Sequence, residues 1–226
     1  FKDTILNKLH SLDKALPVYD TYVNNDRIFK GYTANIKGAE VQGSELVDEV
    51  REIKFHEVRK GDELIALLWY SISKFKKVIN LNTNKMAGIR LRQWNIQIGD
   101  ETNLKKLFNE DRGNMYYFGE IFCFSDKLIA NARRDSFNPN DIQQFLYSDL
   151  ERFFQHLSSL YRKSSQIRNY IKIKDDIDSE VEKYNEKAKT GFTNQKEHED
   201  ALASISVKRK TFEDNIKKVD RMTDDG

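Results

Sequence analysis

Residues 119–141, GEIFCFSDKLIANARRDSFNPND, carry the features that decide how the chain folds. The first six residues are mostly apolar and are typical of a buried β-strand. The last four, NPND, are typical of a helix start, with Asn138 as the N-cap, Pro139 at the first helical position and Asp141 in the first turn. The stretch therefore predicts a strand, a charged loop and a helix in direct succession.

The charged loop, DKLIANARRDSF (residues 126–137), allows two interpretations. In the simpler one it is a solvated connection, and Arg133 and Arg134 pair with surface acids. In the other it reaches a phosphate, because the guanidinium group is a planar fork of donors that binds phosphate in a bidentate manner.

Downstream of this loop the pattern is helical. One apolar stripe predicts a helix that packs on a sheet: Ile142, Phe145, Leu146, Leu150, Phe153, Phe154, Leu157, Leu160 and Tyr161. From about residue 164 the aromatic residues thin out and charges interleave. Two amphipathic segments then flank Gly191, and Asn194 is placed to cap the second, which predicts an antiparallel helical hairpin.

Upstream, residues 52–124 have the pattern of β-strands. A turn at Gly61 and Asp62 separates EIKFHEV from LIALLWYSIS, whose continuous apolar run predicts a strand covered on both faces. GIRLRQWNIQIGD alternates Arg90 and Arg92 against apolar neighbours and reverses at QWN around Trp94, which predicts a β-hairpin. ETNLKKLF predicts a short helix or turn, and MYYFGEIFCF another strand.

The first 50 residues have a weaker pattern. Leucine and isoleucine recur at helical spacing in residues 1–19, and Pro17 marks the expected end of that helix. Residues 20–50 predict short strands or a mobile loop, followed by one turn of helix before Val50. We therefore expect an α+β fold with a lead-in over residues 1–50, a layered domain over residues 51–163 and a helical arm over residues 164–226.

Composition limits the classes of function. The chain has 226 residues and a net charge of +2, so no strong field indicates nucleic acid or an acidic membrane as an obligatory partner. The single cysteine, Cys123, excludes a disulfide framework and favours a reducing, cytoplasmic compartment. No apolar run approaches the roughly 18 residues of a membrane span. Because the sequence begins at Phe1 and not at Met, we expect a piece of a longer protein.

No complete enzyme site is visible in the sequence. The four histidines are scattered, no metal-ligand spacing occurs, and no Gly-rich phosphate loop is present. Cys123 lies between two phenylalanines and is expected to be an inert strand thiol. The remaining candidates form a basic set, and they could pair with surface acids, bind phosphate or stack on single-stranded nucleic acid: Arg90, Arg92, Trp94, Arg112, Arg133 and Arg134.

The succession AGIRLRQWNIQIGD, YFGEIFCF, DKLIANARRDSF and an amphipathic helix resembles the middle, or transducer, domain of GHKL-type ATPases. The resemblance covers roughly residues 50–163. It is closest to bacterial proteins akin to the ninety-kilodalton heat-shock chaperones and more distant for the MORC and MutL ATPases. It implies a layered β-α-β fold of the ribosomal-protein-S-five type, next to a separate N-terminal domain that holds ATP and Mg²⁺.

The resemblance also implies roles for residues of the charged loop. In the chaperone family the loop reads Asn-x-x-Arg-acidic followed by an apolar residue, and Asn131, Arg134, Asp135 and Phe137 match it. Arg134 would contact the γ-phosphate, with its neighbour Arg133 as the alternative. Asn131 and Asp135 would shape the loop.

Two functional hypotheses follow. In the first, the segment binds no cofactor by itself and is inactive alone, but senses ATP held by the N-terminal domain of a parent ATPase, which usually dimerises in this family. In the second, the chain is a non-enzymatic module with a coiled-coil arm that recruits a protein or nucleic acid. Protein folding, DNA repair, chromatin compaction and phage defence all remain open as pathways. The helical arm is a lever, a dimerisation element, a partner-binding arm or a structural cover.

Overall fold

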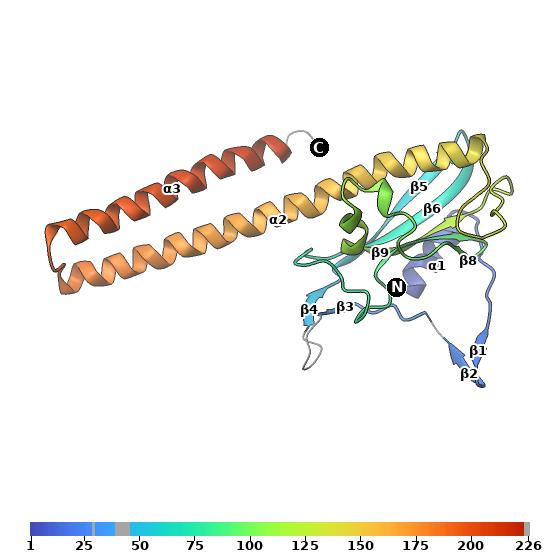
Figure 1. Cartoon of the computed structure of the whole chain (residues 1–226), viewed down its shortest axis with the longest axis horizontal. Helices are drawn as coiled ribbons and strands as arrows, with labels where there is room; N and C mark the ends of the chain where they lie inside the picture. The colour runs from blue at the N-terminus through green and yellow to red at the C-terminus, as the bar shows by residue number, and fades with distance from the viewer. Residues whose placement is uncertain (29, 39–45, 224–226) are drawn as a thin grey trace. The chain divides into compact units, whose positions relative to one another are not determined.

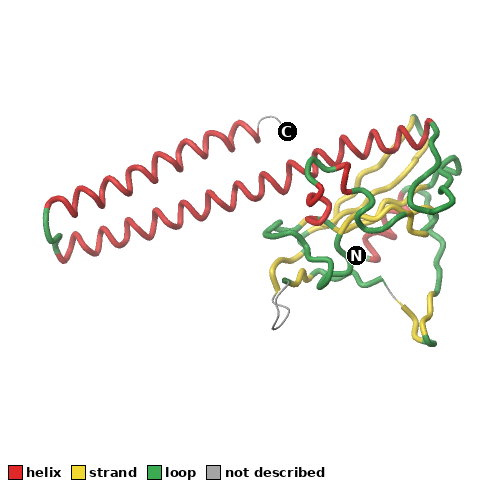
Figure 2. Tube along the Cα trace, viewed as in Figure 1, coloured by secondary structure: helices red, strands yellow, loops and turns green. Residues whose placement is uncertain are grey.

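The computed structural model describes residues 1–28, 30–38 and 46–223. These residues form an α+β protein that divides into two compact units, Phe1–Tyr161 and Arg162–Gly226. The first unit is built around a mixed β-sheet, and the second consists of paired helices (Figures 1 and 2).

A five-stranded sheet forms the centre of the first unit. Its strands lie in the order β5 (Glu52–Lys60), β6 (Glu63–Ile72), β9 (Phe118–Cys123), β7 (Gly88–Gln93) and β8 (Ile96–Ile98). The β7–β9 pair is parallel, whereas the other three pairs are antiparallel. β9 thus joins the two hairpins that precede it in the sequence.

Both predicted hairpin turns are confirmed. Gly61 has a positive φ of 61° in the turn between β5 and β6. Trp94 and Asn95 form the two-residue turn between β7 and β8, with φ of 50° and 66°. Positive φ at both central residues is the requirement of the turn whose twist matches paired strands.

The prediction that β6 is covered on both faces is also confirmed. Leu68 packs in the hydrophobic cluster that includes residues of helix α2 (Asp141–Thr190), whereas Leu67 and Trp69 pack in the cluster that includes Leu9 of helix α1 (Lys2–Ser11). In β9, a Cβ at Gly119 would overlap the Trp69 carbonyl oxygen, so this position accepts only glycine. The sheet is therefore the middle of three layers.

The N-terminal helix α1 (Lys2–Ser11) is shorter than predicted. Asp13 adopts a left-handed φ of 52°, its N–H donates to the His10 carbonyl and the Lys14 N–H donates to the Leu9 carbonyl. This pair of bonds is a Schellman motif. The local C-cap thus ends the helix before Pro17 is reached.

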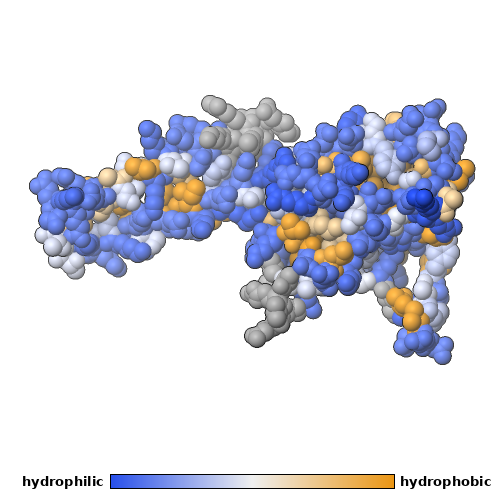
Figure 3. Space-filling view, in the orientation of Figure 1, coloured by the Kyte–Doolittle hydropathy of each residue, from blue (hydrophilic) through white to orange (hydrophobic). Residues whose placement is uncertain are grey.

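Short strands follow α1: β1 (Thr21–Val23), β2 (Asp26–Ile28), β3 (Asn35–Lys37) and β4 (Leu46–Glu49). The predicted turn of helix before Val50 is wrong, because β4 pairs with β3 instead. Residues 39–45 of the lead-in lie outside the described part. Every residue of β1 and β2 is exposed, and apolar side chains gather on this hairpin (Figure 3).

Helix α2 (Asp141–Thr190) starts later than predicted. The Asn140 Oδ1 accepts the N–H groups of Ile142 (3.0 Å) and Gln143 (2.8 Å), so Asn140 and not Asn138 is the N-cap. The Asn138 N–H is already engaged by the Ile129 carbonyl, 2.8 Å away. β9 also begins later than predicted, because residues 115–116 belong to a short 3-10 helix, η2 (Asp111–Tyr116).

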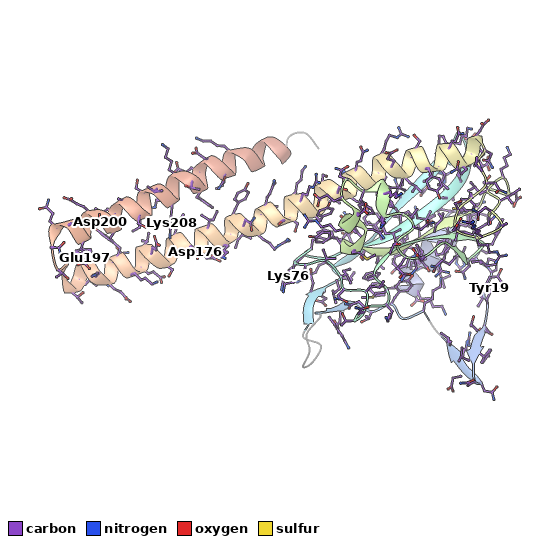
Figure 4. The ribbon with its side chains drawn as sticks, in the orientation of Figure 1. Tyr19, Lys76, Asp176, Glu197, Asp200 and Lys208 are labelled. Carbon is purple, nitrogen blue, oxygen red and sulfur yellow. The ribbon has the colours of Figure 1, made fainter. Side chains whose placement is uncertain are left out.

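The apolar stripe of α2 packs on the sheet as predicted, and the helix has no glycine or proline, so it continues unbroken to Thr190. In the second unit, α3 (Gln195–Thr223) pairs with the later part of α2. Asn194 Oδ1 accepts the Glu197 N–H at 2.9 Å, which confirms the predicted cap. Figure 4 shows Glu197 near the turn and Lys208 further along α3, and their ion-pair partners are Lys187 and Glu180 on α2.

Candidate functional site

The arginine-bearing loop is closed by its own asparagine. Asn131 Nδ2 donates to Asp135 Oδ1 (2.6 Å) and to Ser136 Oγ (3.0 Å), and its Oδ1 accepts the Asp135 N–H (3.2 Å). The Asn131 N–H also donates to the Ser136 carbonyl at 2.9 Å. We call residues 131–136 the Arg loop. These four bonds restrict its backbone to one tight turn.

The base of the Arg loop is anchored in the core. Ala130 and Phe137 form an isolated β-bridge across the loop, and Phe137 is 2% exposed in the cluster beneath α2. The Gln93 amide of β7 donates to the Leu128 carbonyl just before the loop. A loop with a buried base and a capped helix at its exit can hold an arginine in a defined place.

Arg134 occupies the most constrained position of the Arg loop. Its φ is 55°, in the left-handed region that is unusual for a side chain with a Cβ. The Arg134 N–H donates to the Asn131 carbonyl (3.0 Å), and the Arg134 carbonyl accepts the Gly99 N–H (2.7 Å). Arg133 has no backbone bond of this kind among the described contacts. The backbone geometry thus distinguishes Arg134 from its neighbour Arg133.

An open hollow of about 510 Å³ lies between the Arg loop and the segment that follows β8. We call it the Arg-loop hollow, and the residues that line it are Gly99, Asp100, Thr102, Asn103, Lys105, Lys106, Arg133, Arg134 and Asp135. Four of them are cationic and two are acidic. The lining therefore has an excess of positive charge.

The cations of the Arg-loop hollow are largely uncommitted. Within the described residues, neither Arg133 nor Arg134 forms an ion pair, and the same holds for Lys106, whereas Lys105 Nζ lies 3.4 Å from Asp111 Oδ2. Hydrogen bonds from the Thr102 hydroxyl and N–H lower the pKa of Asp100, which keeps this carboxylate ionised and satisfied. The free guanidinium and ammonium groups suit an anionic ligand.

Two arginines of the expected binding surface are committed to the fold. Arg90 is buried, and its guanidinium donates to the carbonyls of Met86 (2.8 Å) and Lys85 (2.6 Å). Arg92 forms an ion pair with Glu120, which is 2% exposed. The alternation of the two arginines on one strand face was predicted correctly, but Arg90 is buried and Arg92 is paired with Glu120, so this face is not the exposed basic surface that was expected.

Trp94 and Arg112 remain accessible. Trp94 is 37% exposed at the tip of the β7–β8 hairpin. The Arg112 guanidinium pairs with Glu110 at 2.6 Å, and its side chain is 63% exposed. Neither residue lines the Arg-loop hollow. The sequence candidates are thus dispersed over separate places on the first unit.

Other titratable groups have structural surroundings. Burial raises the pKa of the Cys123 thiol, which confirms the expectation of an inert strand cysteine. His56 Nε2 lies 2.7 Å from Asp149 Oδ1, and its ring stacks on Phe153. No group of three His, Cys, Asp or Glu residues in the described ranges is arranged to hold a metal ion. Over those ranges no helix has the length and apolar character to cross a membrane.

Lys105 and Lys106 are the candidate residues that sequence reasoning missed. They lie in the short 3-10 helix η1 (Lys105–Leu107), which was predicted only as a helix or turn. About 30 residues of sequence separate them from the Arg loop, and the Gly99–Arg134 hydrogen bond brings the two segments together. The adjacent pair of lysines was the only local signal.

Comparison with protein-family models, with curated proteins and with solved structures found no match.

Proposed function

We propose that the chain is a transducer segment of a GHKL-type, chaperone-like ATPase that works in the cytoplasm. In this proposal the Arg loop contacts the terminal phosphate of ATP held by a separate N-terminal domain. The first unit would then have the layered fold of the ribosomal-protein-S-five type. The observation that carries the proposal is the uncommitted guanidinium of Arg134 on a loop that four side-chain and backbone bonds of Asn131 close.

The chemistry of the Arg-loop hollow supports a phosphate ligand. Its four cationic side chains match an oligophosphate better than a single carboxylate, because charge-assisted bonds from several donors can share one phosphate chain. Asp100 and Asp135 would limit binding of isolated anions. Only the phosphate part of ATP has matching groups here, so the adenine, the ribose and Mg²⁺ would belong to the separate domain.

The fixed backbone at Arg134 offers a physical basis for sensing the nucleotide. Because the loop is already in place before the ligand arrives, only the Arg134 side chain has to become ordered when it contacts the negative charge of the γ-phosphate. If Arg134 contacts that phosphate and not the diphosphate product, the ATP-bound state gains stability relative to the ADP-bound state. That difference in stability would drive a conformational switch between the ATP-bound and ADP-bound states of the parent protein.

The helical arm supplies an output for this switch. Helix α2 begins five residues after Ser136 and continues without a break into the helical pair. A change at the Arg loop would therefore act on the start of the same helix that forms half of the arm. We assign the arm to a lever or to dimerisation of the parent protein, and leave its client open.

The alternative of a nucleic-acid-binding module has less support. It relied on an exposed basic hairpin with Trp94 at its tip, whereas Arg90 is buried and Arg92 is paired with Glu120. Recruitment of a protein by the helical arm remains compatible with the fold.

Titration with inorganic triphosphate tests the proposed phosphate contact. We expect saturable shifts of the Arg134 Nε signal in NMR spectra of this chain, lost in Lys105→Gln/Lys106→Gln and retained in Arg112→Ala. Equal shifts with sodium chloride at the same ionic strength would contradict a phosphate site. The coding sequence upstream of Phe1 tests the other half of the proposal, and an upstream region without an ATP-binding domain would refute it.

A further inference from the structure

A second and smaller hollow, of about 160 Å³, lies beside β7. We call it the β7 hollow. Lys30, Tyr32, Lys85, Arg90 and Arg92 are among the residues that line it. None of them lines the Arg-loop hollow, and the proposed function makes no use of them. Four of these five side chains are cationic.

Arg90 contributes a positive charge that is held by carbonyl oxygens, and Glu120 is its register partner on the neighbouring strand β9. The Arg90 NH1 group donates to the carbonyl oxygens of Met86 (2.8 Å) and Gly88 (3.3 Å), and its NH2 group donates to that of Lys85 (2.6 Å). These acceptors are neutral. Within the described residues Arg90 forms no ion pair, although its residue is only 9% exposed. The guanidinium is thus held firmly, but its charge is only partly compensated by carbonyl dipoles.

One buried carboxylate pairs with two further cations that line the β7 hollow. Glu120 is 2% exposed and pairs with Lys30 (Nζ to Oε1, 2.9 Å) and with Arg92. Three positive charges therefore face one negative charge, and Lys85 adds a fourth cation. Arg90 and Arg92 are largely buried, whereas Lys30 and Lys85 are exposed. The β7 hollow carries an excess of positive charge that is partly shielded from water.

The local electrostatics reflect this excess. Burial lowers the pKa of Lys30, Glu120 partly opposes the effect, and repulsion from Arg92 adds to it. Burial, the nearby Glu120 charge and the hydrogen bond of the Tyr32 hydroxyl to Glu120 raise the pKa of Tyr32, so this hydroxyl stays protonated. Unbalanced buried charge is unfavourable unless a counter-charge accompanies it.

We propose that the β7 hollow binds a compact dianion of the phosphate type. Arg92 would donate to its oxygens from the inside, and Lys30 and Lys85 from the exposed side. The fixed Arg90 charge would act through space. A volume of about 160 Å³ is below the roughly 300–1,000 Å³ of sites for drug-sized ligands, which favours a single phosphate group over a nucleotide.

The proposal is tested by titrating the whole chain with inorganic phosphate at constant ionic strength. NMR signals of the Gly31 amide and of Arg92 Nε report on this hollow, because both residues line it. We expect both signals to shift with one saturable dissociation constant. The absence of a saturable shift, or an equal response to chloride, would overturn the proposal.

Two lysine variants locate the binding. Lys85 is exposed, and none of the described hydrogen bonds or ion pairs of the fold involves its ammonium group, so Lys85→Gln should leave the fold intact. We expect it to weaken phosphate binding at Gly31 and Arg92 about tenfold, the value of one charge-assisted hydrogen bond. The matched control Lys106→Gln alters the Arg-loop hollow and should leave this binding constant unchanged. Weakening by Lys106→Gln together with no effect of Lys85→Gln would contradict the assignment.

Discussion

The Gly99 N–H donates a 2.7 Å hydrogen bond to the carbonyl oxygen of Arg134. This bond joins the segment after β8 to the Arg loop, two parts of the chain 35 positions apart in the sequence. As a result, Lys105 and Lys106 of η1 and the two arginines line one hollow. This hydrogen bond fixes the backbone from which the Arg134 guanidinium extends, and the proposed phosphate contact requires that position.

Because Arg134 has a left-handed φ, substitutions at this position test the stability of the Arg loop independently of the proposed phosphate contact. Arg134→Gly should keep the free energy of unfolding within about 0.5 kcal/mol, because glycine adopts φ of 55° without steric cost. Arg134→Val should lower it by about 1–2 kcal/mol, since a β-branched residue is disfavoured there. Urea denaturation measures both values. Equal stability of the two variants would show that the loop relaxes to another conformation.

The two asparagines before α2 provide a test of its true start. Asn140→Ala should lower the free energy of unfolding by about 1 kcal/mol, because it removes the side-chain acceptor for the N–H groups of Ile142 and Gln143. Asn138→Ala is the matched control and should have little effect, since only the backbone of Asn138 is bonded. Thermal or urea denaturation compares them. A larger loss for Asn138→Ala would return the cap to the position that the sequence predicts.

The Arg92–Glu120 and Arg112–Glu110 ion pairs differ mainly in burial. Glu120→Gln should destabilise the fold by about 3–5 kcal/mol, because it leaves the cations of Lys30 and Arg92 without their buried counter-charge. Glu110→Gln affects the exposed pair with Arg112 and should cost no more than about 1 kcal/mol. Urea denaturation of the two variants in the same buffer gives the comparison. Similar losses of unfolding free energy in the two variants would contradict the role of Glu120 as the buried counter-charge of Lys30 and Arg92.

The turn between α2 and α3 should weaken in acid. Hydrogen bonds from the Lys187 ammonium and from the Thr193 N–H lower the pKa of Glu197 from 4.5 to about 2. Since the pKa is lower in the folded state, the stabilisation is fully present above pH 4.5 and is lost as the pH falls towards 2. The Glu197 carboxyl signal in NMR should titrate near pH 2. In Lys187→Met its midpoint should move up towards 4.5, and an unchanged midpoint would exclude Lys187 as the main cause.

Regular features of the fold could be read from local sequence. The apolar run of β6, the stripe on α2, and the Gly191 and Asn194 signals each reflect a short-range rule of burial, periodicity or capping. The structure has each of them at the predicted place. Such rules hold because the residues that decide the conformation are neighbours in the sequence.

Features that depend on distant contacts were missed. Asn138 and Asn140 have the same side chain, and only the pairing of Asn138 with Ile129 decides which one caps α2. Likewise, the alternation of Arg90 and Arg92 gave the correct face, but not that Lys30 of the N-terminal lead-in would lie with them against Glu120. Neither contact leaves a periodic signal in the sequence.

The residues of the proposed phosphate site were predicted only in part for the same reason. The Arg loop was identified from its own motif, and Asn131 and Asp135 do shape it through their mutual hydrogen bonds. The contribution of Lys105 and Lys106 was not predicted, because it requires the Gly99–Arg134 junction.

Steady-state ATP hydrolysis by a longer protein, in which the proposed ATP-binding domain precedes this segment, is the most direct test of the central claim. Arg134→Ala should lower kcat by about a thousandfold, the lower range for an arginine supplied to a transferring phosphoryl group, and should leave ATP binding largely intact. Arg133→Ala, its adjacent control, should retain most of the activity. Unchanged turnover in Arg134→Ala would contradict the account.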